Sequence, residues 1–162
     1  MSKTTITAGE LEQVGIALNG VFARDLPIKV SYALAKLTRE VEKELKVLNE
    51  IRQKLVKTHA LHNEGNEPLV IENPDTKQKI TVPKGQPITA RDPVTKLLTY
   101  TFENDEIKET YLKDLAELLK MKIEIDHLMI PLDALNNVSF SPVFLKTIMF
   151  MIDDGSKLEE KK

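Results

Sequence analysis

The sequence predicts an α+β fold in which a long N-terminal helical hairpin precedes a small antiparallel sheet and two further helices. Apolar residues recur at helical spacing through residues 8–62, the predicted hairpin. The following stretch begins with turn-forming residues and short β-prone runs, so residues 63–152 are the predicted sheet-and-helix part. Because 162 residues suffice for one core, we expect a single domain at 1–152 and a disordered charged tail at 153–162.

The first predicted helix spans about residues 8–23 and ends near Asn19 and Gly20 or shortly after. Thr7 and Glu10 have the spacing of a capping box, in which the threonine hydroxyl accepts a hydrogen bond from the third helical amide. Apolar residues then follow at three- and four-residue steps, which is typical of one helix face. Asp25 and Pro27 next suit the start of a second helix, because proline is tolerated in a first turn.

The second predicted helix covers residues 28–61, where neither proline nor glycine interrupts the chain. Its apolar residues form a near-heptad stripe: Leu34, Leu37, Val41, Leu45, Leu48, Ile51 and Leu55. A helix of this length is a rod of roughly 50 Å, about twice as long as the first helix. We therefore expect the far half of the stripe to pack against a later helix or against a second copy of the chain.

The remaining elements are short. Prolines are dense between Pro68 and Pro93, which excludes a helix there. The runs at 69–71 and 80–82 predict a β-hairpin, and 97–102 predicts another strand.

Three elements are predicted in the C-terminal part. Asn104 begins a helix, and the alternation over 121–126 predicts a strand with one solvated face. Ser141 and Pro142 then begin an apolar helix that extends to about Ile152. So apolar a helix must be buried, either in the chain's own core, which we favour, or in a partner.

The three histidines are the candidate metal-binding and acid–base groups. His59 and His62, with Glu64 nearby, could hold a divalent ion, but no third strong ligand lies at motif spacing. Imidazoles near a helix C-terminus also interact favourably with its dipole, and we favour this interpretation. His127 follows Asp126 on the predicted strand, where neighbours point to opposite faces, so we expect a packed histidine. We predict no metal site, no cofactor and no enzymatic activity.

Composition limits the classes of partner. Cysteine is absent, which excludes a thiol nucleophile and thiolate metal sites. The 23 basic and 25 acidic residues give a net charge of -2, which argues against a dedicated nucleic-acid binder. The loop at 83–87 lacks the Walker pattern of a phosphate loop. The longest apolar run near the end, 148–152, is far shorter than the roughly 20 residues of a membrane helix. We therefore expect a soluble, cytoplasmic protein.

Two regions resemble a family of small, uncharacterised tailed-phage and prophage proteins. The similar phrases are LPIKV (26–30), YALAKL (32–37), IEI (123–125), IPLDAL (130–135) and FSPVFL (140–145). They fall in the first and last parts of the chain, and residues 63–103 have no counterpart. The resemblance implies a bacteriophage origin, an accessory role and location in the host cytoplasm. It brings no catalytic residues.

From these observations we predict a non-enzymatic phage protein that acts through protein–protein interaction, either in particle assembly or as a component of a complex. It would form a homo-oligomer or bind a phage or host protein. The candidate interaction residues are apolar and helical: Leu45, Leu48, Ile51, Leu55, Phe144 and Ile148. The alternative is a counter-defence protein that binds a host immune effector or sequesters a signalling nucleotide. Five basic residues would then line an anion site: Lys77, Lys79, Lys84, Arg91 and Lys96.

Overall fold

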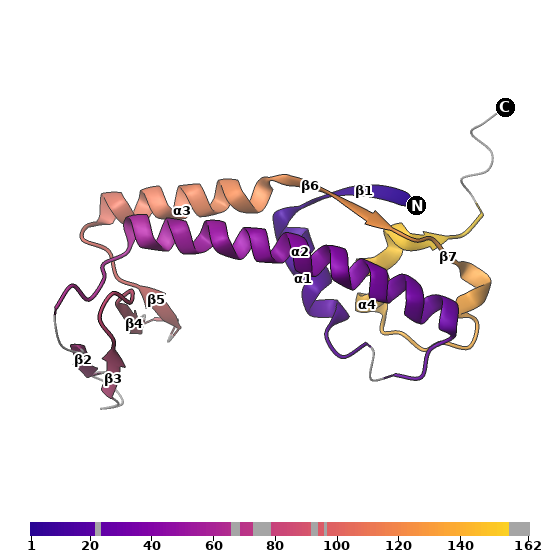
Figure 1. Cartoon of the computed structure of the whole chain (residues 1–162), viewed down its shortest axis with the longest axis horizontal. Helices are drawn as coiled ribbons and strands as arrows, with labels where there is room; N and C mark the ends of the chain where they lie inside the picture. The colour runs from indigo at the N-terminus through magenta and orange to yellow at the C-terminus, as the bar shows by residue number, and fades with distance from the viewer. Residues whose placement is uncertain (22–23, 66–68, 73–78, 92–93, 96, 156–162) are drawn as a thin grey trace. The chain divides into compact units, whose positions relative to one another are not determined.

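The computed structural model describes residues 1–21, 24–65, 69–72, 79–91, 94–95 and 97–155. The chain combines helices with small two-stranded sheets, most of them antiparallel, which confirms the α+β class (Figure 1). The chain divides into two compact units. Unit 1 combines Met1–Leu48 with Leu118–Lys162, and unit 2 is Asn49–Glu117. The long helix α2 (Ile28–His59) and the helix α3 (Asp105–Lys120) contribute residues to both units, so the boundaries between the units lie within these two helices.

Unit 1 begins with a strand that the sequence analysis did not predict. β1 (Ser2–Thr7) pairs antiparallel with β6 (Lys122–His127), which confirms the strand expected at 121–126. In the register of this pair, Ile6 lies opposite Ile123 and Thr4 lies opposite Ile125. The β-branched residues of β1 suit a pleated surface, although most of them are threonines and carry little apolar signal.

The capping box at the start of α1 (Ala8–Leu18) is confirmed. The Glu10 amide donates to the Thr7 hydroxyl at 3.2 Å, and the Thr7 amide donates to the Glu10 carboxylate at 2.7 Å. The predicted end of this helix near Asn19 and Gly20 is confirmed. The helix ends at Leu18, because Asn19 adopts an extended conformation and Gly20 turns the chain with a φ of 80°.

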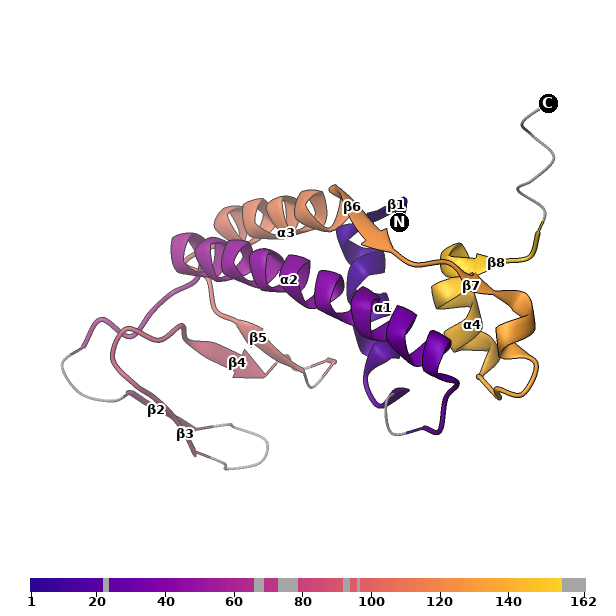
Figure 2. The same ribbon diagram turned by 45° about the vertical axis from the view of Figure 1, so that its right-hand side comes forward.

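α1 crosses α2 in unit 1, as both ribbon views show (Figures 1 and 2). Gly15 allows the two helices to approach closely at Val41 and Leu45. The second predicted helix is confirmed and ends two residues early, at His59. Buried apolar side chains from both helices form most of the core of unit 1: Leu11, Val14, Leu18, Val30, Leu34, Leu37, Val41 and Leu48.

The C-terminal helix α4 (Pro142–Ile148) adds Phe144 and Ile148 to the buried residues of unit 1. Ser141 caps it as predicted, since its hydroxyl accepts a hydrogen bond from the Phe144 amide at 3.2 Å. Helical conformation continues to Met151, within one residue of the predicted end, although its last turn is the 3-10 helix η3 (Met149–Met151), and Ile152 begins β8 (Ile152–Asp153).

β8 pairs in parallel with β7 (Ile130–Pro131), and the short 3-10 helix η2 (Leu132–Leu135) follows β7. Asp153, where the predicted tail begins, therefore belongs to a strand pair. Residues 156–162 of that tail lie outside the described residues.

Unit 2 contains two antiparallel hairpins (Figure 2). β2 (Leu69–Glu72) pairs with β3 (Lys79–Val82), which confirms the predicted hairpin. β5 (Leu98–Tyr100) confirms the next predicted strand and pairs with β4 (Thr89–Arg91), which was not predicted. The two pairs form separate two-stranded sheets.

In unit 2, the C-terminal end of the apolar stripe on α2 is covered by α3. Val56 and Ala60 are buried with Tyr111 of α3, and Leu55 packs against this cluster. A later helix of the same chain therefore covers this end of α2, which is one of the two expected arrangements. Asn104 caps α3 by accepting a hydrogen bond from the Ile107 amide at 2.9 Å.

Candidate functional site

The two histidines near the end of α2 have different partners. His59 Nε2 lies 3.2 Å from a carboxylate oxygen of Asp114, and its ring lies edge-on to Tyr111 with centroids 6.2 Å apart. His62 Nδ1 donates to the Ala60 carbonyl oxygen at 2.8 Å. Within the described part of the chain, no three side chains of the metal-binding types come together. These histidines therefore take part in the packing and turn structure of unit 2.

His127 is a packed histidine, as expected. Its side chain is 1% exposed on the inner face of β6. Nε2 lies 2.9 Å from the Thr4 hydroxyl on the neighbouring strand, and the ring contacts Phe150 edge-on with centroids 5.1 Å apart. Asp126, the neighbouring residue that could have formed an acid–base pair, is on the opposite face of the strand.

The six predicted interaction residues take part in packing within their own units. In unit 1, Leu48, Phe144 and Ile148 are buried, and Leu45 is half-buried beside Gly15. In unit 2, Leu55 packs on the Val56 cluster and Ile51 is half-buried.

The exposed apolar side chains of the C-terminal segment lie on the other faces, at Val143 and Met149. The sequence therefore identified an apolar segment but not which of its faces meets solvent, because buried and exposed positions are equally apolar.

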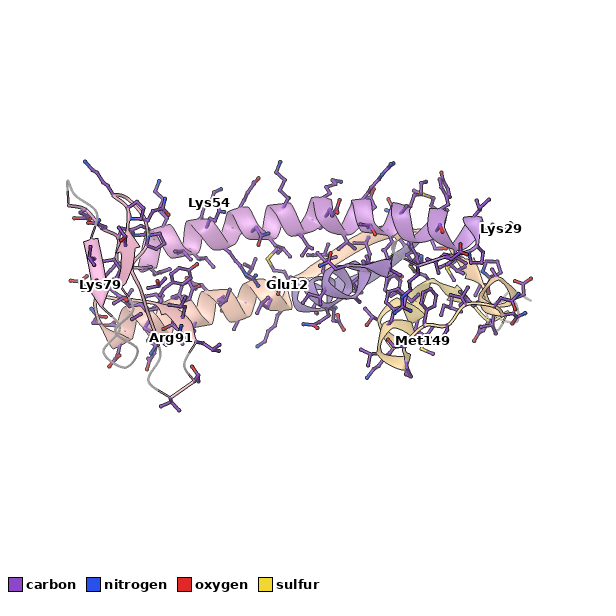
Figure 3. All side chains as sticks on the ribbon, turned by 90° about the horizontal axis from the view of Figure 1, so that it is seen from below. Glu12, Lys29, Lys54, Lys79, Arg91 and Met149 are labelled. Carbon is purple, nitrogen blue, oxygen red and sulfur yellow. The ribbon has the colours of Figure 1, made fainter. Side chains whose placement is uncertain are left out.

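The predicted anion-site residues are spread over several elements. Lys77 and Lys96 lie outside the described residues. Lys79 is the first residue of β3 and Arg91 is the last residue of β4 (Figure 3). These two strands belong to different sheets. Lys84 lies in the turn after β3.

Unit 2 has a cleft of about 1180 Å³ that the sequence analysis did not identify. One wall is a polar face of α2 formed by Asn49, Arg52, Gln53, Val56 and Lys57. The facing wall is a loop pair formed by His62, Glu64, Gly85, Gln86 and Pro87. Tyr100 and Tyr111 complete the lining. The cleft could not be found from the sequence, because the loops that line it together with α2 are distant from Arg52 and Lys57 in the chain.

The loop wall of the cleft is fixed by Asn63, which is 6% exposed. Its amide donates to the Gln86 carbonyl at 3.0 Å, and its own carbonyl accepts from the Gly85 amide at 2.8 Å. Its side-chain nitrogen donates to the Val82 carbonyl at 2.9 Å. Gly85 adopts a φ of 76°, which a turn at this point requires and which glycine adopts without strain. Asn63 thus joins the 62–65 segment to the end of β3 through its side chain and to the turn at 83–86 through its backbone.

The electrostatics of the cleft favour negative charge. Among the lining residues, the two cations Arg52 and Lys57 outnumber the one carboxylate, Glu64. Burial raises the pKa of the Tyr111 hydroxyl, Tyr100 raises it further, and the positive charge of Arg52 opposes both. The charge of Arg52 therefore influences the hydroxyl of Tyr111. The ring of Tyr111 packs edge-on against that of Tyr100, with ring centroids 6.3 Å apart.

Unit 1 has a second hollow of different character, the C-terminal groove, with a volume of about 340 Å³. Its lining is mainly apolar: Leu132, Leu135, Val138, Phe140, Leu145, Met149 and Ile152, with Asp154 as the charged member. Leu132 is 52% exposed and Met149 is 68% exposed. Large apolar side chains thus remain in contact with solvent around an apolar hollow.

Comparison with protein-family models finds no match, and comparisons with curated proteins and with solved structures find none either. Among the described helices, none is both long enough and apolar enough to cross a bilayer.

Proposed function

We propose that this chain is a non-enzymatic accessory protein that binds another protein through the C-terminal groove of unit 1. The observation that carries the proposal is the exposure of Leu132 and Met149 beside an apolar hollow. Burying one such side chain in an interface contributes about 1.5–3 kcal/mol. Part of the groove falls within 130–145, where the sequence resembles small tailed-phage proteins. A phage accessory or assembly component in the host cytoplasm is the setting that we propose.

The charges near the groove indicate the chemistry of the partner. Asp154 lines the groove, and Asp133 and Asp153 are exposed on η2 and β8. A carboxylate in the lining of an apolar hollow favours a segment that inserts an apolar side chain and carries lysine or arginine beside it. A groove of about 340 Å³ is at the small end of ligand pockets, which suits one or two anchoring side chains.

Native mass spectrometry of the full chain, purified gently from bacterial cells, tests this proposal. We expect a complex with a second protein, which Leu132→Asp and Met149→Asp each weaken. Leu112→Asp is the matched control, because Leu112 is 50% exposed on α3 and lies outside the groove. Circular dichroism should show that all three variants remain folded.

Two results would contradict the proposal. One is a monomer under all conditions. The other is a complex that is as stable in the two groove variants as in the Leu112→Asp control. A homo-oligomer that dissociates in the groove variants would identify the partner as a second copy of the chain.

A further inference from the structure

We propose that the cleft of unit 2 binds a nucleotide, with its ring against Tyr100 and its phosphates near Arg52 and Lys57. This site is separate from the C-terminal groove and does not depend on the proposed function. It also differs from the anion site expected from the sequence, because Lys79, Lys84 and Arg91 do not line the cleft.

The positive charges of the cleft are arranged along one helix. Arg52 and Lys57 are five residues apart on α2, which separates them by roughly 7.5 Å along the helix axis and by about 140° around it, so they stand at the two edges of the lining face. A guanidinium binds phosphate oxygens through two parallel hydrogen bonds, and an ammonium adds a compact charge. Two cations at opposite edges of the lining face suit a chain of phosphates, which can extend from one to the other, better than a single small anion.

The aromatic residues supply a surface for a planar ring. Tyr100 is 38% exposed, whereas Tyr111 is 8% exposed. Tyr111 is held from its other sides by Phe102, with centroids 5.1 Å apart, and by His59. Tyr111 thus forms a rigid base for Tyr100, whose exposed surface remains available for stacking. Stacking on a tyrosine is tolerant of base identity, because every base has a π face.

Side-chain amides on both walls provide donors and acceptors for the edge of a ring. Gln53 projects from α2 and Gln86 from the facing turn, and both line the cleft. Asn63 fixes the position of that turn before any ligand arrives, which reduces the entropy lost on binding. The volume of about 1180 Å³ exceeds that of most small-molecule pockets and accommodates a nucleotide with its phosphates.

Isothermal titration calorimetry of the full chain with ATP, AMP and inorganic phosphate as separate probes tests the site. We expect ATP to bind more tightly than AMP, and inorganic phosphate to bind weakest. Arg52→Gln and Lys57→Gln should each weaken ATP binding about tenfold or more, since each removes a charge-assisted contact. Lys54→Gln is the matched control, because it makes the same change on the same helix outside the cleft (Figure 3).

Tyr100→Leu separates ring recognition from phosphate recognition. We expect it to weaken ATP binding and to leave phosphate binding unchanged. The proposal is overturned if none of the three probes binds, or if the Arg52, Lys57 and Lys54 variants bind ATP equally well. It is also overturned if Tyr100→Leu leaves the affinity for ATP intact. Unfolding curves of each variant show whether it is folded. If Arg52→Gln does not fold, Lys57→Gln still tests whether the positive charges of the cleft bind ATP.

Discussion

In α1, Gly15 lies so close to Leu45 of α2 that a Cβ atom on residue 15 would stand 2.7 Å from Leu45 Cδ1. The same atom would lie 3.5 Å from Val41 Cγ1, which is an ordinary contact distance. The glycine therefore sets how closely the first helix approaches the long one. Glycine inside a helix costs about 1 kcal/mol relative to alanine, so this close approach has an intrinsic cost.

Substitutions at Gly15 should separate these two effects. We expect Gly15→Ala to change the free energy of unfolding by less than about 1 kcal/mol, because its gain in helix propensity offsets the displacement of one leucine methyl group. Gly15→Val should lower the free energy of unfolding by about 2 kcal/mol, because the larger side chain displaces Leu45 further and valine is a weaker helix former. Urea unfolding measures both. A Gly15→Val variant as stable as Gly15→Ala would show that the helices separate at little cost.

The local signals in the sequence were accurate where a few neighbouring residues determine the structure. The caps at Thr7, Asn104 and Ser141 are all present, because each hydrogen bond joins residues three positions apart. The long helix was predictable for the same reason, since its periodicity extends over many turns.

Pairing between distant segments was not predictable. β1 pairs with a strand more than a hundred residues later, and the Thr4–His127 contact joins residues 123 positions apart. The cleft of unit 2 was missed for the same reason. Arg52 lies on a helix and Gln86 in a turn beyond a hairpin, so only the folded chain brings them together.

Glu10 should make stability depend on pH in the acid range. Hydrogen bonds from the Thr7 backbone amide and then from the Thr7 hydroxyl lower the pKa of Glu10 below its usual 4.5. A lowered pKa in the folded state contributes stability above the usual value, and this contribution is lost as the pH falls through the lowered pKa. Glu10→Gln keeps a capping side chain without a titrating group.

We expect the stability advantage of the wild type over Glu10→Gln to be constant above about pH 4.5 and to shrink on acidification. Urea unfolding across the acid range measures this difference, and the shared background of other carboxylates cancels in the comparison. Parallel pH profiles for the two proteins would show that the Glu10 cap does not contribute to the pH dependence.

The Thr4 hydroxyl should stabilise unit 1 through its contact with buried His127. Thr4→Val replaces the hydroxyl with a methyl group of similar size and removes the 2.9 Å contact to Nε2. Losing the partner of a buried polar atom costs about 1–3 kcal/mol, so we expect the free energy of unfolding to fall by that amount. Thr5→Val is the matched control, because Thr5 is exposed on the opposite face of β1 and the substitution is the same. Equal stability of the two variants would contradict the prediction.

Asn63 should stabilise the loop wall of unit 2 more than any exposed residue beside it. Asn63→Ala leaves the Val82 carbonyl without its 2.9 Å donor and the Gly65 amide without its 3.0 Å acceptor. Each loss costs about 1–3 kcal/mol when the groups stay away from water, so local opening should become easier. Hydrogen exchange should become faster at the Gly85 and Ile88 amides, which donate to the backbone carbonyls of Asn63 and Leu61.

Gln86→Ala is the control for the Asn63 variant, because the backbone carbonyl of Gln86, and not its side chain, accepts from the Asn63 amide. We expect exchange at the Gly85 amide to remain slow in Gln86→Ala. The β1–β6 amides of unit 1 should keep their protection in both variants, because they belong to the other compact unit. Loss of protection throughout the chain in Asn63→Ala would instead mean that the two units unfold together.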